Sequence, residues 1–397
     1  MKRSVGVIAR GIRTPIVSTG DKIEEIVTNS IQKAAEMEGF SIQDRDIIGV
    51  TESVVARAQG NYASADDIKM DINNKYDGET LGVLFPILSR NRFAVLLKGI
   101  ARGAKHIVLM LQYPSDEVGN PLVSIEKLDE KGIDPWKDNL TEEGFYKAFG
   151  ETIHPFTGIN YIEYYRSIIE TSGAKCTILF SNRPEAVLSY TEQVLTCDVH
   201  TRLRTKKQLL KAGAKKVYGL DDILITSMNG SGYNPEYGLL GSNKATEETV
   251  KLFPRDSQKV AEEIQAVMKE RTGKKVEVLV YGDGAFKDPQ GKIWELADPV
   301  VSPGYTVGLE GTPNEVKIKY LADNDFADLK GEALKAAIAE HIKNKKENLT
   351  GAMEAQGTTP RKLTDLIGSL CDLTSGSGDK GTPVVYIQGY FDSYIEA

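Results

Sequence analysis

A glycine-rich loop near the C-terminus carries residue types that hold phosphate. Residues 376–382 read Gly-Ser-Gly-Asp-Lys-Gly-Thr, and Pro383 and a short apolar run follow. Consecutive amides in such a backbone can form an anion-binding nest, to which Lys380 adds a positive charge. A Walker A loop needs GxxxxGK followed by Ser or Thr and then a helix. The loop is therefore not a P-loop, and its residues fit either a non-Walker phosphate site or an ordinary turn between a helix and a strand.

A second polar segment, residues 280–299, places acidic side chains just after a strand of buried type. Its sequence is VYGDGAFKDPQGKIWELADP, with acids at Asp283, Asp288 and Asp298. Carboxylates in a glycine-rich loop at a strand end are a usual way to hold Mg²⁺ against nucleotide phosphates. Ordinary turns contain the same residues, so both interpretations stay open at this stage.

Arginines beside turns form a third group of candidates. Arg13 and Arg57 each lie next to a turn, where a guanidinium can bind carboxylate or phosphate through two hydrogen bonds. Arg90 and Arg92 lie at the start of a predicted helix, whose first amides favour anions. Salt bridges on the surface are the alternative for each of these residues.

The length, composition and charge of the chain restrict its domain organisation and its partners. A chain of 397 residues predicts two domains, or one domain with a large insertion. Its 41% hydrophobic and 26% charged residues are typical of a soluble globular protein. The net charge of −7 argues against nucleic acid as a partner. No apolar run approaches the roughly 20 residues that span a bilayer, and no signal peptide is recognisable, so we expect a cytoplasmic protein without a membrane partner.

Cysteine and histidine usage restricts the metal chemistry. The three cysteines show no CxxC spacing, and the four histidines are scattered along the chain. This pattern predicts neither a disulfide framework nor a zinc site. Any metal is therefore expected to be a hard cation bound through oxygen.

Hydrophobic periodicity predicts the elements that must position these side chains. At the N-terminus we expect a strand at 4–9, a helix within 19–38, and at 46–60 a strand that runs into a polar turn. Between 62 and 225 helix-like and strand-like runs alternate, which indicates a sheet covered by helices. The predicted helices are 89–104, 183–190 and 205–214, and the predicted strands are 105–113, 176–182 and 192–200.

The C-terminal part begins with the clearest helix pattern in the chain, at 255–275. Asp256 or Ser257 can cap this helix, and Gly273 closes it. The strand that follows alternates valines with Glu277, as a half-buried strand would. Two further helices are predicted at 328–347 and 359–373, the second of which leads into the glycine-rich loop.

Four of these segments, in this order, resemble the coenzyme F-420 gamma-glutamyl ligase family, whose fold is CofE-like. GIRTPIVSTGDKIEEIV (11–27) and DIIGVTESVVARAQG (46–60) are similar to the family's opening turn-helix and the strand that follows it. The segment 234–286 resembles its Asn-containing loop, a connecting helix and the strand that carries metal-binding acids. The segment 363–389 resembles its closing helix, glycine-rich loop and strand.

The resemblance implies an α+β or α/β fold with an inserted α/β segment. Residues 1–61 and 226–397 would form a CofE-like ligase core, and 62–225 an enlarged or inserted region. It also implies a nucleotide-dependent ligase, in which GTP (or ATP) phosphorylates a small-molecule carboxylate and the amine of L-glutamate then attacks the acyl phosphate. Mg²⁺ or Mn²⁺ would bridge the phosphates, and the chains would pair as a homodimer.

Candidate site residues follow from these residue types and from the resemblance together. We expect the catalytic residues to be Arg57 and Lys380. We expect the nucleotide to contact Arg13, Gly238, Ser242, Asn243, Gly376, Ser377, Gly378 and Gln388. We expect the metal ligands to be Asp283, Asp288, Asp365 and Asp379.

The chain departs from the family pattern at several of these positions. Leu240 stands where the family has a metal-binding Asp, Ser377 where it has Glu or Gln, and Gln388 where it has Arg. The residues 62–225 could supply replacement groups, with Asp221, Asp222, Arg90, Arg92 and His200 as candidates. A ligase with a changed acceptor is the leading hypothesis, and a non-catalytic relative that binds a nucleotide or metabolite is the alternative.

Overall fold

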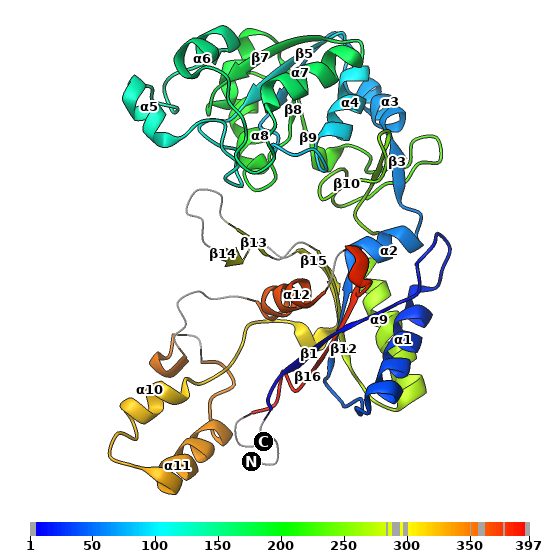
Figure 1. Ribbon diagram of the computed structural model, residues 1–397, viewed down its shortest axis with the longest axis vertical. Helices are drawn as coiled ribbons and strands as arrows, with labels where there is room; N and C mark the ends of the chain where they lie inside the picture. The colour runs from blue at the N-terminus through cyan, green and yellow to red at the C-terminus, as the bar shows by residue number, and fades with distance from the viewer. Residues whose placement is uncertain are drawn as a thin grey trace. The chain divides into compact units, whose positions relative to one another are not determined.

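The chain divides into two compact units, shown with their element labels in Figure 1. The computed structural model describes residues 5–282, 285–287, 294–296, 301–349, 351–355, 362–375 and 378–393. Unit 1 comprises Met1–Val55, Asp256–Phe286 and Glu295–Ala397, and unit 2 comprises Ala56–Arg255 and Lys287–Trp294. The segment 226–255, which the sequence analysis assigned to the ligase core, thus lies in unit 2. Within the described residues, no helix is long and apolar enough to cross a bilayer.

Unit 1 is built around a five-stranded sheet with the order β1-β16-β2-β12-β15. Only β2 and β12 run parallel to each other, and the other neighbours are antiparallel. The strands are β1 (Ile8–Ile12), β2 (Ile47–Thr51), β12 (Glu277–Gly282), β15 (Val301–Tyr305) and β16 (Val384–Gln388). The helices that begin in this unit are α1 (Ile23–Glu38), α2 (Glu52–Ala58), α9 (Ser257–Thr272), α10 (Ile318–Asp323), α11 (Gly331–Lys343) and α12 (Leu363–Thr374). A short hairpin, β13 (Ala285–Lys287) and β14 (Trp294–Leu296), forms a separate two-stranded sheet.

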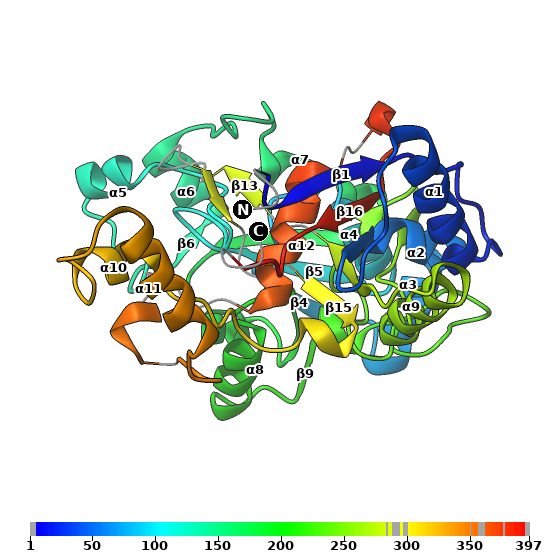
Figure 2. The same ribbon diagram turned by 90° about the horizontal axis from the view of Figure 1, so that it is seen from below.

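Helices cover both faces of this sheet. Helices α1 and α9 pack together against one face, and α12 lies against the other, beside β1 and β16 (Figure 2). Because both faces are covered, β12 is buried along Glu277–Tyr281, and the expectation of a half-buried strand is wrong. The Glu277 carboxylate is accommodated by hydrogen bonds from the Thr306 hydroxyl and the Gln265 amide.

The close approach of α12 to the sheet depends on a glycine in β2. A Cβ atom built on Gly49 would lie 2.3 Å from the Cys371 Sγ of α12 and 3.2 Å from the Tyr281 ring. Cys371, Tyr281 and Ile367 belong to one buried apolar cluster, which includes side chains of β2, β12 and β16. The missing side chain at Gly49 therefore lets α12 seal this face of the sheet.

Unit 2 contains a six-stranded sheet with the order β6-β7-β5-β4-β8-β9. All neighbours except β6 and β7 are parallel, so the chain starts at the central β4, builds outward through β5 and β7, and then returns to β8. This order is that of a doubly wound α/β sheet. The strands are β4 (Thr80–Leu84), β5 (His106–Leu111), β6 (Leu140–Thr141), β7 (Lys175–Phe180), β8 (Gln193–Thr196) and β9 (Lys216–Gly219).

Two apolar clusters bury the faces of this sheet. The larger cluster joins β4, β5 and β7 to helices α3, α4 and α7, and the smaller one joins the opposite face to α8. Helix α3 starts at a capping box, in which the Ser64 hydroxyl accepts from Asp67 N and the Asp67 carboxylate accepts from Ser64 N. The helices of unit 2 are α3 (Ala65–Lys75), α4 (Ala94–Arg102), α5 (Ile125–Lys131), α6 (Glu142–Phe149), α7 (Tyr161–Thr171) and α8 (Arg202–Lys211).

A small antiparallel sheet completes unit 2. It has the order β10-β11-β3 and consists of β10 (Asn243–Lys244), β11 (Thr249–Lys251) and β3 (Tyr62–Ser64). It joins the first strand of the unit to the segment that follows the six-stranded sheet.

The expected α/β fold class is confirmed, but one predicted strand is wrong beyond Thr51. Residues Glu52–Ala58 form α2 instead, and the buried Glu52, Val55 and Ala56 recur at the spacing of three and four that a helix produces. The predicted cap of α9 also differs. Asp256 occupies the N-cap position at φ +52°, but its side chain makes no capping hydrogen bond.

We expect the substitution Gly49→Ala to destabilise unit 1, because the new methyl group would overlap Cys371. Overpacking of this kind costs about 1–3 kcal/mol in unfolding free energy, measurable by urea denaturation. Gly6→Ala is the matched control, since a Cβ there meets no atom within 4 Å. Equal unfolding midpoints for the two variants would contradict the proposed role of Gly49.

A buried histidine organises the turn between α6 and α7. His154 is only 5% exposed, and its Nδ1 accepts hydrogen bonds from the amides of Phe156 and Thr157. Its Nε2 is buried without a hydrogen-bond partner among the described residues. Burial lowers the pKa of His154 below 6.5, because the charged ring loses its hydration.

Unfolding free energy should therefore fall as pH drops through 6.5. The unfolded chain takes up a proton at residue 154 in this range, whereas the folded chain resists protonation until a lower pH. His154→Asn keeps an acceptor near the position of Nδ1 and should lose less stability between pH 7.5 and pH 5, measured by urea denaturation at each pH. His200→Asn, an exposed position, should retain the wild-type pH dependence; a matching slope in His154→Asn would refute the assignment.

Candidate functional site at the carboxyl ends of β2 and β12

One edge of the unit 1 sheet gathers the ends of three strands, β1, β2 and β12, and the starts of the other two, β15 and β16. The parallel strands β2 and β12 end here, at Thr51 and Gly282. Strand β1 also ends here, since Ile12 pairs with Val384 at the start of β16. Ligands commonly bind beyond the carboxyl ends of parallel strands, so this edge is the place to look for a site in unit 1.

Two hydrogen bonds join the glycine-rich loop to the other segments at this edge. Thr14 N donates to Gly381 O at 3.3 Å, and Thr51 N donates to Pro383 O at 3.0 Å. Within the loop, Gly378–Lys380 form a single 3₁₀ turn before β16. The structure thus brings Arg13 and Lys380 to the same edge, although they are far apart in sequence.

Charged side chains of both signs lie at this edge. Arg13, Asp379 and Lys380 are all exposed, and Lys380 and Arg13 supply two positive charges on neighbouring segments. Phosphate oxygens are bound by this combination of a guanidinium, an ammonium and loop amides. Gly376 and Ser377 lie outside the described residues, so the nucleotide contacts expected of them stay predictions.

One acid at this edge, Glu52, was not predicted from the sequence as a site residue. Glu52 directly follows β2 as the first residue of α2, and it is only 8% exposed. The signal was available, because a carboxylate immediately after a buried strand is the feature used to select Asp283. We overlooked it because the segment was predicted to continue as a strand. Asp283 and Asp288 lie outside the described residues, so their role as metal ligands stays a prediction.

The carboxylates at this edge could hold a hard cation only with help from other ligands. No group of three or more His, Cys, Asp or Glu side chains suited to a metal occurs within the described ranges. Mg²⁺ is commonly bound through one or two carboxylates, several waters and substrate phosphates. Glu52 and Asp379 fit that kind of site, whereas they do not amount to an all-protein cage.

Arg57 lies further along the helix that starts at this edge. It is an exposed residue in the last turn of α2, five residues after Glu52. The rise of an α-helix places it about 8 Å along the axis from Glu52.

Asp365 lies at the opposite end of α12 from the glycine-rich loop. It is in the first turn, where its carboxylate accepts from Lys362 N at 3.3 Å, and the loop follows the last residue, Thr374. Asp365 and Thr374 are nine residues apart in the helix, which corresponds to about 14 Å along its axis. Asp365 thus lies at the far end of α12 from the start of the glycine-rich loop.

Gln388 is at the opposite edge of the sheet from Lys380. Its Oε1 accepts from Arg10 Nη1 at 2.6 Å, and its Nε2 donates to Ser41 O at 2.9 Å and to an Asp46 carboxylate oxygen at 3.3 Å. Asp46 is buried and also accepts a hydrogen bond from the Tyr386 hydroxyl. The described contacts of Gln388 thus join β16 to β1 and to the segment before β2.

The Asn-containing loop lies in unit 2 and is held by close packing. Gly238 has φ +52°, and a Cβ there would lie 2.6 Å from the carbonyl oxygens of Leu220 and Ile223. Ser242 is 2% exposed, and its hydroxyl is buried without a hydrogen-bond partner among the described residues. Asn243 begins β10 and pairs with Lys251.

Buried amide side chains fix the two ends of this loop region. Asn234 donates to the carbonyl oxygens of Phe253 and Pro254 and accepts from the amides of Glu236 and Tyr237. Asn61 also donates to Phe253 O, at 2.7 Å. Asn234, at the start of the segment that resembles the family's loop, is thus fully used in holding the backbone. The nucleotide contact expected of Asn243 stays a prediction.

The suggested replacement acids in unit 2 are engaged in ion pairs. Asp221 pairs with Arg202 at 2.9 Å and with Lys206 at 2.8 Å, and Asp222 pairs with the same lysine at 2.6 Å. Burial acts to raise the pKa of Asp221, but its hydrogen bonds and charge interactions with Lys206 and Arg202 outweigh burial and lower it. Arg90 and His200 are exposed on loops that follow β4 and β8, and Arg92 is half-buried.

Substitutions at Gln388 and at Lys380 should have different effects on the free energy of unfolding. Gln388→Leu leaves Arg10, Asp46 and Ser41 O without their amide partner, so we expect unfolding free energy to fall by about 1–3 kcal/mol. Lys380→Met is the control, in the loop that precedes the other end of β16. A substitution at this exposed position should change the free energy of unfolding by no more than about 0.5 kcal/mol. Chemical denaturation measures both, and equal stabilities would show that the Gln388 network contributes little.

Comparison with known proteins connects this edge to a family. No curated protein matches the chain. The family model described as F420-0:gamma-glutamyl ligase matches residues 11–389, a span that runs from β1 through both units to the end of β16. The resemblance drawn from four segments is thereby confirmed over nearly the whole length. The chain belongs to the F420-0:gamma-glutamyl ligase family.

Proposed function

We propose that the chain is a nucleotide- and metal-dependent amide ligase, which adds an amino acid such as L-glutamate to a small carboxylate acceptor through an acyl phosphate. The family match across residues 11–389 carries this proposal. The convergence of Arg13, Lys380 and Glu52 on one sheet edge supports it, because the reaction needs cationic groups for phosphate and oxygen ligands for a cation. We further propose that the enzyme is a cytoplasmic homodimer.

The proposed reaction has two steps, phosphoryl transfer to the acceptor and attack by the amine. A carboxylate oxygen of the acceptor attacks the γ-phosphorus of GTP or ATP, and the bond from that phosphorus to the β–γ bridging oxygen breaks. The nucleoside diphosphate leaves, and an acyl phosphate forms. The amine of the amino acid then attacks the acyl carbon, inorganic phosphate leaves with the bonding electrons, and the amine proton passes to solvent or a base.

The residues at the sheet edge have distinct roles in this scheme. Lys380 and Arg13 bind the transferring phosphate and offset the charge that two anionic reactants bring together. Glu52 and Asp379 are the described carboxylates that would hold Mg²⁺ or Mn²⁺, which supplies charge neutralisation at the phosphates when bound. Asp283 and Asp288 remain proposed ligands from the adjoining segment.

The substitution Lys380→Met tests the phosphate role. Loss of one charge-assisted contact costs about 1.5–3 kcal/mol, so we expect roughly a ten- to hundredfold weaker Kd for GTP or ATP with Mg²⁺. Lys362→Met is the matched control, because it removes an exposed lysine before the opposite end of α12. Calorimetric titration measures the affinities, and mass spectrometry follows glutamate addition in a panel of carboxylate acceptors.

The outcomes distinguish the two functional hypotheses. Nucleotide binding with phosphate release only when both glutamate and an acceptor are present supports the ligase. Nucleotide binding without phosphate release in any mixture favours the non-catalytic relative. Equal affinities in Lys380→Met and Lys362→Met would show that the phosphates bind elsewhere.

A further inference from the structure

Unit 2 contains a pocket outside the elements considered so far. It lies in the long connection between β5 and α7, where residues 121–127 face residues 151–155 across a cavity of about 520 Å³. The first segment leads into α5, and the second follows α6. A volume of this size is within the range of small-molecule sites, about 300–1,000 Å³.

The floor of the pocket is apolar. Leu122 and Val123 line it and belong to the main apolar cluster of unit 2, at 7% and 5% exposed. Ile125 and Ile153 also line it but are 51% and 63% exposed. A ligand with an apolar body would therefore remove from water the large side chains that the folded chain leaves accessible.

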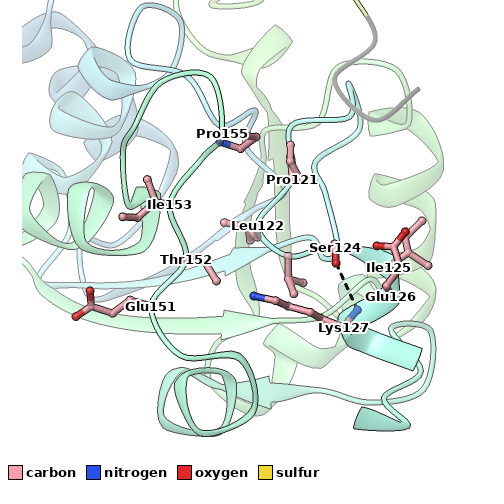
Figure 3. A pocket seen from close by; sticks show the side chains of 11 residues that line it. Pro121, Leu122, Ser124, Ile125, Glu126, Lys127, Glu151, Thr152, Ile153 and Pro155 are labelled. Carbon is pink, nitrogen blue, oxygen red and sulfur yellow. Dashed lines mark hydrogen bonds between the residues drawn. The ribbon is translucent and has the colours of Figure 1, made fainter. Parts of the chain in front are cut away.

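Two polar groups in the pocket have no partner within the described part of the chain. The Lys127 side chain extends from α5 across the pocket toward Thr152, and its ammonium takes part in no ion pair there (Figure 3). The Thr152 hydroxyl is buried and makes no hydrogen bond to any residue that the structure describes. A buried hydroxyl without a partner costs free energy, which a bound acceptor atom would recover.

Two carboxylates at the pocket are directed away from this pair. Glu126 lies on the outer side of α5 and Glu151 at the far end of the opposite segment, and neither points toward the Lys127 ammonium (Figure 3). The only cationic group that lines the pocket is thus not neutralised by its two acidic neighbours. An ammonium beside a hydroxyl donor is suited to bind a carboxylate.

We propose that this pocket binds a small monocarboxylate with an apolar body. The carboxylate receives hydrogen bonds from Lys127 and Thr152, and the body lies on Leu122, Val123 and the exposed isoleucines. The site uses residues of unit 2 only and does not depend on the proposed ligase reaction.

A titration with 4-phenylbutyrate tests the proposal on the full-length protein. Amide NMR shifts should saturate at residues 122–127 and 151–154, with a Kd on the order of 1 mM for a ligand of this size. Lys127→Gln and Thr152→Val should each weaken binding, the former by about tenfold. Lys131→Gln, on the same helix but outside the pocket, should bind like the wild type.

Isosteres of the probe separate the charge requirement from apolar contact. The neutral 4-phenylbutanol and the cationic 4-phenylbutylamine should bind at least about fivefold more weakly than the carboxylate. The proposal is overturned if either isostere binds as tightly, or if Lys127→Gln retains wild-type affinity. It is also overturned if shifts gather at other residues, or if none saturate up to about 10 mM probe.

Discussion

The pairing of β16 between β1 and β2 is the constraint on which unit 1 depends. A strand from the end of the described chain, Val384–Gln388, lies between two strands from its beginning, with a register set by Ile12 opposite Val384 and Ile47 opposite Ile387. Since β16 runs antiparallel to both neighbours, the loop before it must meet the ends of β1 and β2. The sheet edge with Lys380 and Arg13 exists only after this long-range pairing has formed.

The residues at the two ends of β16 consequently have different environments. At one end, Gln388 is nearly buried and bonded to Arg10 and Asp46, which fixes the strand by specific polar contacts. At the other end, Lys380 and Asp379 remain exposed and able to meet a ligand. A buried polar network resists register shift because each broken contact leaves a desolvated group behind. The hydrogen bonds of Gln388 therefore fix the register of β16, and with it the position of the loop that carries Asp379 and Lys380.

Sequence patterns predicted the fold class and the family, because helix periodicity, glycine spacing and the order of motifs are local properties. They failed where tertiary contacts decide the outcome. Glu277 is buried because α9 and α12 cover both faces of the sheet, which no local pattern contains. Asp365 and Gln388 matched family positions, yet helix length and strand direction carry them away from the loop. Glu52 was missed because a strand was extended into a helix.

Polar side chains occupy the carboxyl edge of the unit 2 sheet. A doubly wound sheet usually binds ligands where its strand order reverses, here between β4 and β8. In this chain, carboxylates from the loop after β5 occupy the neighbouring amides. Asp116 accepts from Leu88 N, and Glu117 accepts from the amides of Val199 and His200. Burial raises the pKa of both acids, so holding them there costs free energy that these hydrogen bonds partly offset. The usual ligand position is thus occupied by the protein's own side chains, whereas Lys127 and Thr152 lie in the connection beyond it.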